Sequence, residues 1–209
     1  MKQIFPDLWQ TPTEHPFPGV NTHAYLLTQE NGNILFYSAS LRQEQPQIQA
    51  LGGIACQFLS HKHEAGPALA RIKQSFGSKL FYHRFEKAEI EQFAPADYLF
   101  EHRETRQGNI EIIPTPGHTP GSTCFLVHSV HGQKYLFTGD TVYPNGSGWE
   151  TRCKQIEGGS RADLRQSLML LRQLSPDVVI SSASIGDAAF KSVDNEEWQS
   201  AIDKLVAAL

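Results

Sequence analysis

The sequence contains few cysteines, and those present are not arranged in pairs. Among its 209 residues are three cysteines, Cys56, Cys124 and Cys153, and none belongs to a Cys-x-x-Cys motif. An odd number of unpaired cysteines argues against a disulfide framework and against a thiolate zinc site. Cys56 and Cys124 lie in apolar runs and are expected to be small buried side chains, whereas Cys153 lies in a polar loop and its role stays open.

Long apolar runs and clustered positive charge are also missing. No stretch of about 18 apolar residues occurs, and the first residues include no apolar run of signal-peptide length. We therefore expect a cytoplasmic protein with no membrane association. The 18 Lys and Arg residues are scattered and are outnumbered by 22 Asp and Glu residues. Without a basic stripe to neutralise a phosphate backbone, nucleic acid is not expected as a partner.

What the sequence has is enough apolar material for one core. Hydrophobic residues make up 40% of the chain, which has 12 phenylalanines. A chain of this length is too short for two ordinary domains without an evident linker, so we expect one domain over residues 1–209. An apolar edge in the first hairpin could pair with a second copy, which leaves a homodimer open.

Apolar periodicity predicts alternating strands and helices in the first half of the chain. Two short apolar runs flank Asn31 and Gly32, a pair suited to a tight turn, which predicts an opening hairpin over residues 24–28 and 34–37. Helical spacing and further apolar runs then predict helices over 46–51, 65–75 and 84–93 and strands over 54–60, 79–82 and 97–100. In the helix over 84–93, Phe85, Ile90 and Phe93 are expected to share the apolar face.

The second half repeats this alternation with longer helices. It predicts strands over 110–113, 123–128, 134–138 and 177–181 and helices over 161–174 and 195–208. Strands gathered in two sets, with amphipathic helices between and after them, suggest two stacked sheets covered by helices on the outside. The expected fold class is therefore α/β, with the layer order α/β/β/α, although periodicity alone does not fix that order.

Four polar side chains at predicted strand ends could meet at one point. His61 and His63 follow an apolar strand, and in an extended segment alternate side chains point to the same side. His118 lies in a loop stiffened by proline and glycine, and Asp140 follows another strand. Sites on layered α/β folds usually form in such loops, so these residues are the candidate metal ligands.

With these motifs, the sequence resembles the metallo-β-lactamase superfamily, whose fold is shared by glyoxalase II-like hydrolases, lactonases, persulfide dioxygenases and β-lactamases. The resemblance extends from about Val20 to Gly186. It rests on Ser60-His61-Lys62-His63, on Pro116-Gly117-His118-Thr119-Pro120-Gly121 and on Thr138-Gly139-Asp140-Thr141. It implies the four-layer fold, with His61, His63 and His118 as ligands of a first metal and Asp140 beside it.

The sequence departs from that family at the second metal. Where the family has an aspartate and a histidine after His-x-His, this chain has Ala65 and Gly66, and Ile185 occupies the position of the late histidine. The early Asp-x-Gly is replaced by Tyr37-Ser38-Ala39, so its supporting hydrogen bonds must be made otherwise. Because neighbouring strand residues point apart, Glu64 is not expected to rescue the second site. It is interpreted as a solvated side chain at a helix start.

The donor set predicts one divalent metal ion. Three imidazoles and a carboxylate suit zinc, whereas His61, His118 and Asp140 alone would also suit ferrous iron. We expect a metal-dependent hydrolase with a mononuclear site, an unknown small-molecule substrate and Asp140 as catalytic residue. The alternatives are a non-catalytic relic site and a mononuclear iron enzyme that oxidises thiols or persulfides. In the loop after Asp140, Tyr143 and Trp149 either line the pocket or pack locally.

Overall fold

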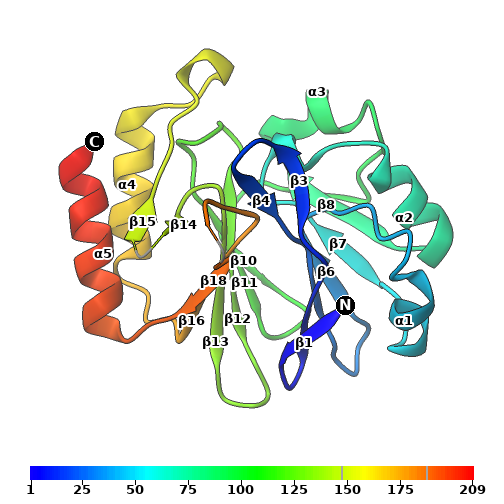
Figure 1. Ribbon diagram of the computed structural model, residues 1–209. Coiled ribbons are helices and arrows are strands. Elements are labelled where there is room, and N and C mark those ends of the chain that lie inside the picture. The colour runs from blue at the N-terminus through cyan, green and yellow to red at the C-terminus, as the bar shows by residue number, and fades with distance from the viewer. Residues whose placement is uncertain (147, 187) are drawn as a thin grey trace.

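Two large β-sheets lie face to face with helices on the outer face of each (Figure 1). The computed structural model describes residues 1–146, 148–186 and 188–209. Helices α1, α2 and α3 cover one sheet and α4 and α5 cover the other (Figure 1). The expected α/β/β/α order is therefore confirmed.

The first sheet is built from the N-terminal half of the chain. Its seven strands are, in spatial order, β1 (Lys2–Phe5), β2 (Leu8–Gln10), β5 (Tyr25–Leu27), β6 (Ile34–Phe36), β7 (Cys56–Phe58), β8 (Lys79–His83) and β9 (Tyr98–Phe100). From β6 to β9 the strands run parallel, and parallel neighbours need crossover connections. These crossovers contain α1 (Gln45–Ala50), α2 (Ala68–Phe76) and α3 (Lys87–Ile90).

The second sheet is built from the C-terminal half. Its six strands are, in spatial order, β10 (Glu104–Arg106), β11 (Ile110–Pro114), β12 (Thr123–His128), β13 (Lys134–Gly139), β16 (Val178–Ser181) and β18 (Phe190–Ser192). The outer face carries α4 (Arg161–Leu171) and α5 (Asn195–Ala208). Asp194 and Glu197 form a reciprocal capping box at the start of α5, which satisfies amide groups that a helix start leaves unpaired.

Short strands and turns complete the edge where the sheets meet. A three-stranded sheet joins β3 (Glu14–Phe17), β4 (Val20–Thr22) and β17 (Ala183–Ser184), and a hairpin joins β14 (Tyr143–Asn145) to β15 (Gly148–Glu150). Three 3-10 turns, η1 (Lys62–Glu64), η2 (Arg84–Glu86) and η3 (Gln155–Glu157), lie in the connecting segments. Because β17 pairs with β4, residues from both ends of the chain shape this edge.

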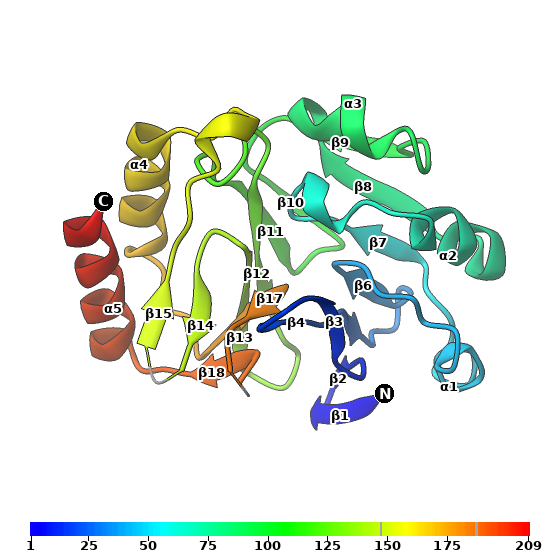
Figure 2. The same cartoon turned by 45° about the horizontal axis from the view of Figure 1, so that its top comes forward.

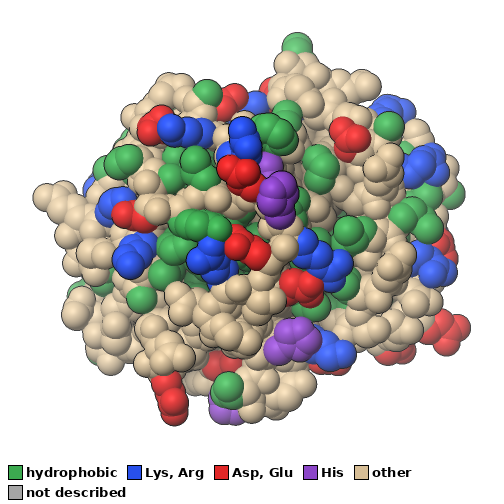
Figure 3. All heavy atoms as spheres, turned by 180° about the vertical axis from the view of Figure 1, so that it is seen from behind, with side chains coloured by type: hydrophobic (Ala, Val, Ile, Leu, Met, Phe, Trp, Pro, Cys, Tyr) green, Lys and Arg blue, Asp and Glu red, His purple; other side chains and the backbone are tan. Residues whose placement is uncertain are grey.

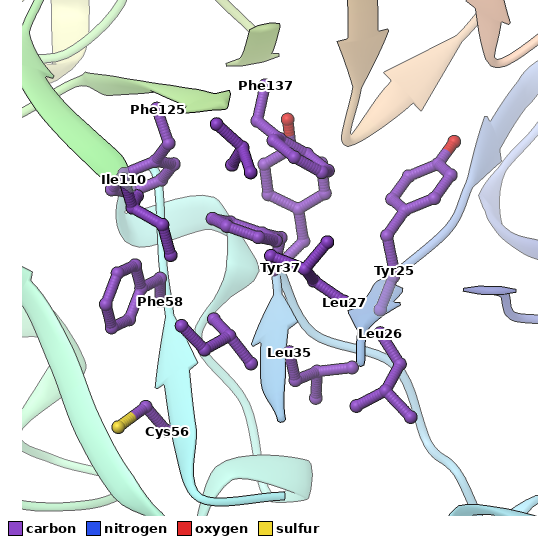
Figure 4. Close-up of a cluster of buried hydrophobic side chains, with 14 of the residues drawn as sticks. Tyr25, Leu26, Leu27, Leu35, Tyr37, Cys56, Phe58, Ile110, Phe125 and Phe137 are labelled. Carbon is purple, nitrogen blue, oxygen red and sulfur yellow. The ribbon is translucent and has the colours of Figure 1, made fainter. Parts of the chain in front are cut away.

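Aromatic side chains from both sheets fill the space between them (Figure 4). The rings of Phe36 and Phe137 stack with centroids 3.9 Å apart and join the two sheets. Phe58 and Phe125 extend this contact with centroids 5.6 Å apart. All four side chains are fully buried. Such burial of apolar surface is the main favourable contribution to folding, and here it fixes the two sheets relative to each other.

Most predicted elements are confirmed. The short strands β10, β14, β15, β17 and β18 were not predicted, and two further regions differ. β5 and β6 form the predicted antiparallel hairpin, but four strands that the sequence analysis did not find precede it. The helix predicted over 84–93 was wrong: only η2 and the short α3 form there. Ile90 is buried as expected, whereas Phe85 and Phe93 are 62% and 41% exposed, so the apolar spacing does not mark one buried face.

The surface mixes charges of both signs. On the face drawn in Figure 3, basic and acidic side chains are interspersed with hydrophobic ones. Among the described residues, no helix has the length and apolarity that a membrane span needs. Cys56 and Cys124 are buried as predicted, and Cys153 is partly buried against the core between the second sheet and its helices.

Candidate metal centre

The four predicted ligands meet at one edge of the paired sheets, which Figure 2 turns toward the viewer. His61 and His63 follow β7 of the first sheet. His118 lies between β11 and β12 of the second sheet, and Asp140 directly follows β13. One ligand atom of each residue lies within 4.8 Å of those of the others. Each sheet therefore contributes two ligands.

Two of the imidazoles face the same carboxylate oxygen. Oδ2 of Asp140 lies 3.4 Å from Nε2 of His61 and 3.6 Å from Nε2 of His118. Nδ1 of His63 lies 3.1 Å from Nε2 of His118. The three rings are nearly perpendicular to one another, with centroids 4.9–5.2 Å apart. The nitrogens of the three rings therefore surround a common point beside Asp140.

His61 is held from behind by Glu64. The Ser60 hydroxyl donates its hydrogen to Oε1 of Glu64 and so accepts from Nδ1 of His61 at 2.9 Å. The Ser60 amide donates to Oε2 of Glu64 at 2.9 Å. The prediction that Glu64 is solvated was wrong, because its side chain is only 6% exposed. The short η1 turn, rather than a continuing strand, brings this carboxylate back over His61.

His63 points toward the centre for a different reason than predicted. His61 has extended backbone angles, but His63 lies inside the η1 turn, so the alternation of an extended strand does not apply. Nε2 of His63 donates to the carboxylate of Glu157 in η3. That bond turns Nδ1 toward the other imidazoles. His63 is also the most exposed of the three histidines, at 30% of its side chain.

His118 is fixed by the close packing of its loop. A Cβ on Gly117 would lie 2.4 Å from the Cα of Leu164 in α4, so only glycine allows this approach. Glu86 accepts a 2.8 Å hydrogen bond from the Thr119 hydroxyl and so ties the other side of the loop to the first sheet. Nδ1 of His118 donates to the carbonyl of Arg152 at 2.7 Å. The ring therefore presents Nε2 to the centre.

Asp140 is positioned by a serine and by a tight turn. The Ser182 hydroxyl donates to Oδ1 of Asp140 at 2.7 Å. The preceding Gly139 has φ of 54°, and its amide donates to the Tyr37 hydroxyl at 3.0 Å. The same hydroxyl donates to the carbonyl of Ile180 at 2.9 Å. Tyr37 thus makes hydrogen bonds beside the site. It occupies the position where the superfamily that the sequence resembles has its early Asp-x-Gly.

The electrostatics of the centre favour a cation. Burial by itself lowers the pKa of His61, but the carboxylates of Asp140 and Glu64 raise it to about 10. Burial and the positive charge of His61 lower the pKa of His118 to about 4. Burial by itself raises the pKa of Asp140, yet His61, His118 and Ser182 hold that pKa below its ordinary value. The centre therefore holds an ionised carboxylate that stabilises positive charge.

The hydrogen bonds of the three histidines fit a metal ion. Each ring donates from its outer nitrogen, which leaves a lone pair on Nε2 of His61, Nδ1 of His63 and Nε2 of His118 when the rings are neutral. Two such lone pairs face each other at 3.1 Å. Among the described residues, buried Nε2 of His61 has no hydrogen-bond partner. A cation between these atoms would satisfy all three nitrogens.

Three positions that would complete a second metal site carry no ligand atoms. Gly66 and Ile185 line the same cavity as the histidines, and Ala65 precedes Gly66. Glu64 is turned toward Ser60 and does not join the ligand group. The described residues thus provide one cluster of metal-binding side chains at this edge.

The ligands open into a cavity of about 850 Å³. The β3–β4 hairpin, the segment after β6, the start of α2 and the loops after β13 and β16 form its walls. Tyr143 lines this cavity, whereas Trp149 packs edge-on against Trp198 at 6.1 Å. Of the two alternatives for these aromatics, the first holds for Tyr143 and the second for Trp149.

Sequence reasoning predicted the four side chains that form this group but missed the residues that orient them. Glu64, Glu157 and Ser182 each contact a ligand side chain. Glu157 and Ser182 lie 94 and 42 residues along the chain from the ligands that they contact. No local sequence pattern marks Glu157 or Ser182. For Glu64, the available signal was an acidic residue directly after His63, but its side chain was predicted to point into solvent.

Comparison with known proteins identifies the family. The profile of the metallo-beta-lactamase superfamily matches residues 58–183, more than half of the chain. The chain belongs to the metallo-β-lactamase superfamily. All four candidate ligands lie inside the matched region.

Relatives in this superfamily agree with the fold. A metallo-beta-lactamase from Pontibacter korlensis superposes with a TM-score of 0.74 at 16% identity, covering 100% of this chain and 98% of that one. ETHE1 from Myxococcus xanthus superposes with a TM-score of 0.64 at 18% identity, covering 90% of each chain. These identities show a shared fold.

A curated relative is closer in sequence over a shorter stretch. Hydroxyacylglutathione hydrolase from Salmonella arizonae is 37% identical over 75 residues, which are 36% of this chain and 26% of that enzyme. The match therefore spans about a quarter of the length of that relative.

Proposed function

We propose that this chain is a hydrolase that uses one divalent metal ion, with His61, His63, His118 and Asp140 as its ligands and a small molecule as its substrate. A metal ion bound there would polarise the scissile group and make a water molecule more acidic. The superfamily membership and the ligand group support this proposal. Zinc is the proposed metal, because three imidazoles and one carboxylate match its preferred donors.

In this proposal, different side chains bind the metal ion, accept a proton and orient the carboxylate. His61, His63 and His118 bind from one side with nitrogens held in place by Glu64, Glu157 and the carbonyl of Arg152. Asp140 is the acidic side chain at the centre and would accept a proton from the attacking water. Ser182 keeps that carboxylate oriented through Oδ1, which leaves Oδ2 toward the reacting groups.

One observation carries the proposal. All three histidines donate from their outer nitrogens to fixed acceptors, so their remaining nitrogens converge beside an ionised aspartate. A set of histidines that merely hydrogen-bonded to one another would have no need of three separate outer acceptors. Outer partners of this kind raise the basicity of ligand imidazoles and fix their orientation in metal sites.

The same geometry supports a second candidate, a mononuclear iron enzyme that oxidises thiols or persulfides. His61 and His118 both face Oδ2 of Asp140, and two histidines with one carboxylate are a donor set for ferrous iron. His63 is more exposed and is bonded to Glu157, so it is the ligand that this alternative would leave out.

Metal analysis of protein made without a histidine tag tests the metal. We expect about one equivalent in the wild type and a loss of most of it in His118→Ala. His131→Ala is the matched control, because His131 is exposed and lies outside the ligand group. No metal in the wild type, even after incubation with zinc or iron under anaerobic conditions, would contradict the proposal and favour a non-catalytic relic.

Substrate panels then separate the two activities. Thioesters, lactones, β-lactams and phosphodiesters are assayed with zinc-loaded protein, and oxygen uptake with thiols and persulfides is followed with iron-loaded protein. Hydrolysis lost in Asp140→Asn but kept in His131→Ala supports the hydrolase. Oxygen uptake without hydrolysis would contradict the hydrolase and support the iron enzyme.

A further inference from the structure

The cavity above the metal ligands contains basic side chains that the proposed hydrolysis does not use. Four acidic and four basic side chains line it. Among the basic ones, Lys154 is paired with Glu157, with Nζ 3.6 Å from Oε1. The guanidinium groups of Arg42, Arg71 and Arg152 have neither a salt bridge nor a hydrogen bond to any described residue.

The acidic side chains of the cavity, in contrast, are all engaged. Glu14 accepts from the Ser40 amide at 2.8 Å, and Glu64 accepts from Ser60. Glu157 bonds His63, and Asp140 faces the imidazoles and Ser182. None of these carboxylates neutralises an arginine. A bound divalent cation would add further positive charge, so the loaded cavity would attract an anion.

Arg71 is the most constrained of these arginines. It lies on α2, little more than one turn after Gly66, and lines the cavity. Its Nε is buried, with no hydrogen-bond partner among the described residues. An unsatisfied buried donor on a charged group is costly, and a bound oxyanion would remove that cost through charge-assisted hydrogen bonds. Arg42, from the segment between β6 and α1, is exposed and lines the same cavity.

Apolar side chains also line the cavity. Phe17 in the β3–β4 hairpin is 69% exposed, and Ile185 after β17 is 38% exposed. Both line the cavity, and the family resemblance implies a histidine of the second metal site at the position of Ile185. A ligand in the cavity would therefore meet the candidate metal ligands, apolar side chains and guanidinium groups that no described residue pairs.

We propose that the substrate carries an oxyanion group, a carboxylate or a phosphate, which Arg71 and Arg42 bind at a distance from the scissile bond. The statement that this anion belongs to a substrate rests on the proposed hydrolase function. The binding of an anion by the two arginines does not depend on it. Guanidinium groups bind both kinds of oxyanion in bidentate fashion. The chemistry shared by the two is a compact negative charge with at least two acceptor oxygens.

Binding to metal-free protein tests the anion site independently of catalysis. Glutarate and phenyl phosphate serve as carboxylate and phosphate probes, and glutaramide is the neutral comparator, with affinities measured by calorimetry at low salt. We expect at least one anion to bind and glutaramide not to bind. Arg71→Met should weaken that anion about tenfold, the loss expected for one charge-assisted hydrogen bond. The probe that binds more tightly identifies the oxyanion.

Arg165→Met is the matched control. Arg165 is also a helical arginine, but it is exposed on α4 and does not line the cavity. Its affinity for the probes should equal that of the wild type. Equal anion binding by wild type, Arg71→Met and Arg165→Met would overturn the inference, as would the absence of anion binding by folded wild-type protein.

Kinetics give a second readout if hydrolysis is found. The 4-nitrophenyl monoester of glutarate is compared with its methyl-capped neutral form on zinc-loaded protein. Arg71→Met should raise KM for the charged ester about tenfold, leave its kcat within about a factor of two, and leave the neutral ester unchanged. If Arg71→Met weakens anion binding but no substrate of the panel is hydrolysed, the hydrolase proposal fails and the anion site stands.

Discussion

The Ser182 hydroxyl donates a 2.7 Å hydrogen bond to Oδ1 of Asp140, so Oδ2 is the oxygen that faces His61 and His118. Ser182 lies between β16 and β17, and its position depends on the pairing of β17 with β4. The small three-stranded sheet therefore contributes to the orientation of the carboxylate at the centre.

Ser182→Ala should weaken metal binding about tenfold, because removing an outer hydrogen bond lets the carboxylate rotate. Competition of zinc-loaded protein with a chromophoric chelator measures this. Ser192→Ala, at an exposed serine in β18, is the control and should match the wild type. An unchanged zinc affinity in Ser182→Ala would show that Asp140 needs no outer support.

Glu64→Ala should also reduce zinc affinity, by about tenfold, because His61 then loses the carboxylate that orients its ring through Ser60. The same chelator competition gives the readout. Glu30→Ala removes an exposed carboxylate in the turn between β5 and β6 and serves as the control. Equal affinities in the two variants would return Glu64 to the role of a surface residue.

Gly117→Ala should destabilise the fold by about 3 kcal/mol, since the new Cβ would overlap the backbone of α4 at Leu164. Gly108→Ala is the control for backbone strain: Gly108 has φ of 80° and nothing within 4 Å of an added Cβ. It should cost about 1 kcal/mol. Urea unfolding measures both, and similar values for the two variants would mean that the loop moves away freely.

Asp97 should make stability depend on pH. Partial burial alone raises its pKa, but hydrogen bonds from Lys73 and the Leu80 amide lower it below the ordinary value of 3.8. A carboxylate with a lowered folded-state pKa stabilises the fold above its unfolded pKa, and this contribution is lost as the pH falls through the folded pKa.

Asp97→Asn should therefore cost about 0.5–1 kcal/mol at pH 7, a value reduced for solvent screening of an ion pair whose side chains are 30% and 34% exposed. Urea unfolding curves should converge with those of the wild type as the pH is lowered below 4. Asp203→Asn removes a more exposed carboxylate, 52% exposed and paired with Arg172, and should have a smaller effect at pH 7. A constant difference at all pH values would rule out this ionisation as the cause.

Restoring three ligands should create a second metal site. The combined variant Ala65→Asp, Gly66→His and Ile185→His places ligand side chains at the positions where the superfamily pattern has them. Nothing lies within 4 Å of a Cβ at Gly66, so the Cβ of the new side chain fits without a clash. Metal analysis should rise from one equivalent to two, while the combination Ala65→Asn, Gly66→Ala and Ile185→Leu should stay at one.

The sequence predicted most strands and helices and the four candidate ligands from local signals, whereas the layer order followed from the family resemblance. Apolar runs mark β11, β12, β13 and α5 closely, and the ligands lie in short motifs at strand ends. The strands before Tyr25 were missed, because runs of three or four residues interrupted by proline and polar residues carry little periodicity. Their pairing with β5 and β17 is a tertiary effect.

The orienting residues could not be predicted for a related reason. His61 is supported by Glu64 through an η1 turn that no pattern indicated, and the interpretation of Glu64 as the start of a helix placed that carboxylate in solvent. Tyr37 has φ of 69°, an uncommon conformation for a tyrosine, and its hydroxyl reaches Gly139 on the other sheet. Contacts of this kind depend on how the two sheets pack, which the spacing of apolar residues does not encode.

Because His61 and His63 come from one sheet and His118 and Asp140 from the other, an ion held by all four would act as a clasp between the two halves of the chain. A ligand that binds only the folded state adds stability in proportion to the logarithm of its concentration, about 2.7 kcal/mol at 100 times its dissociation constant. The resistance of this protein to heat would then follow the metal content of its surroundings, independently of whether any substrate is turned over.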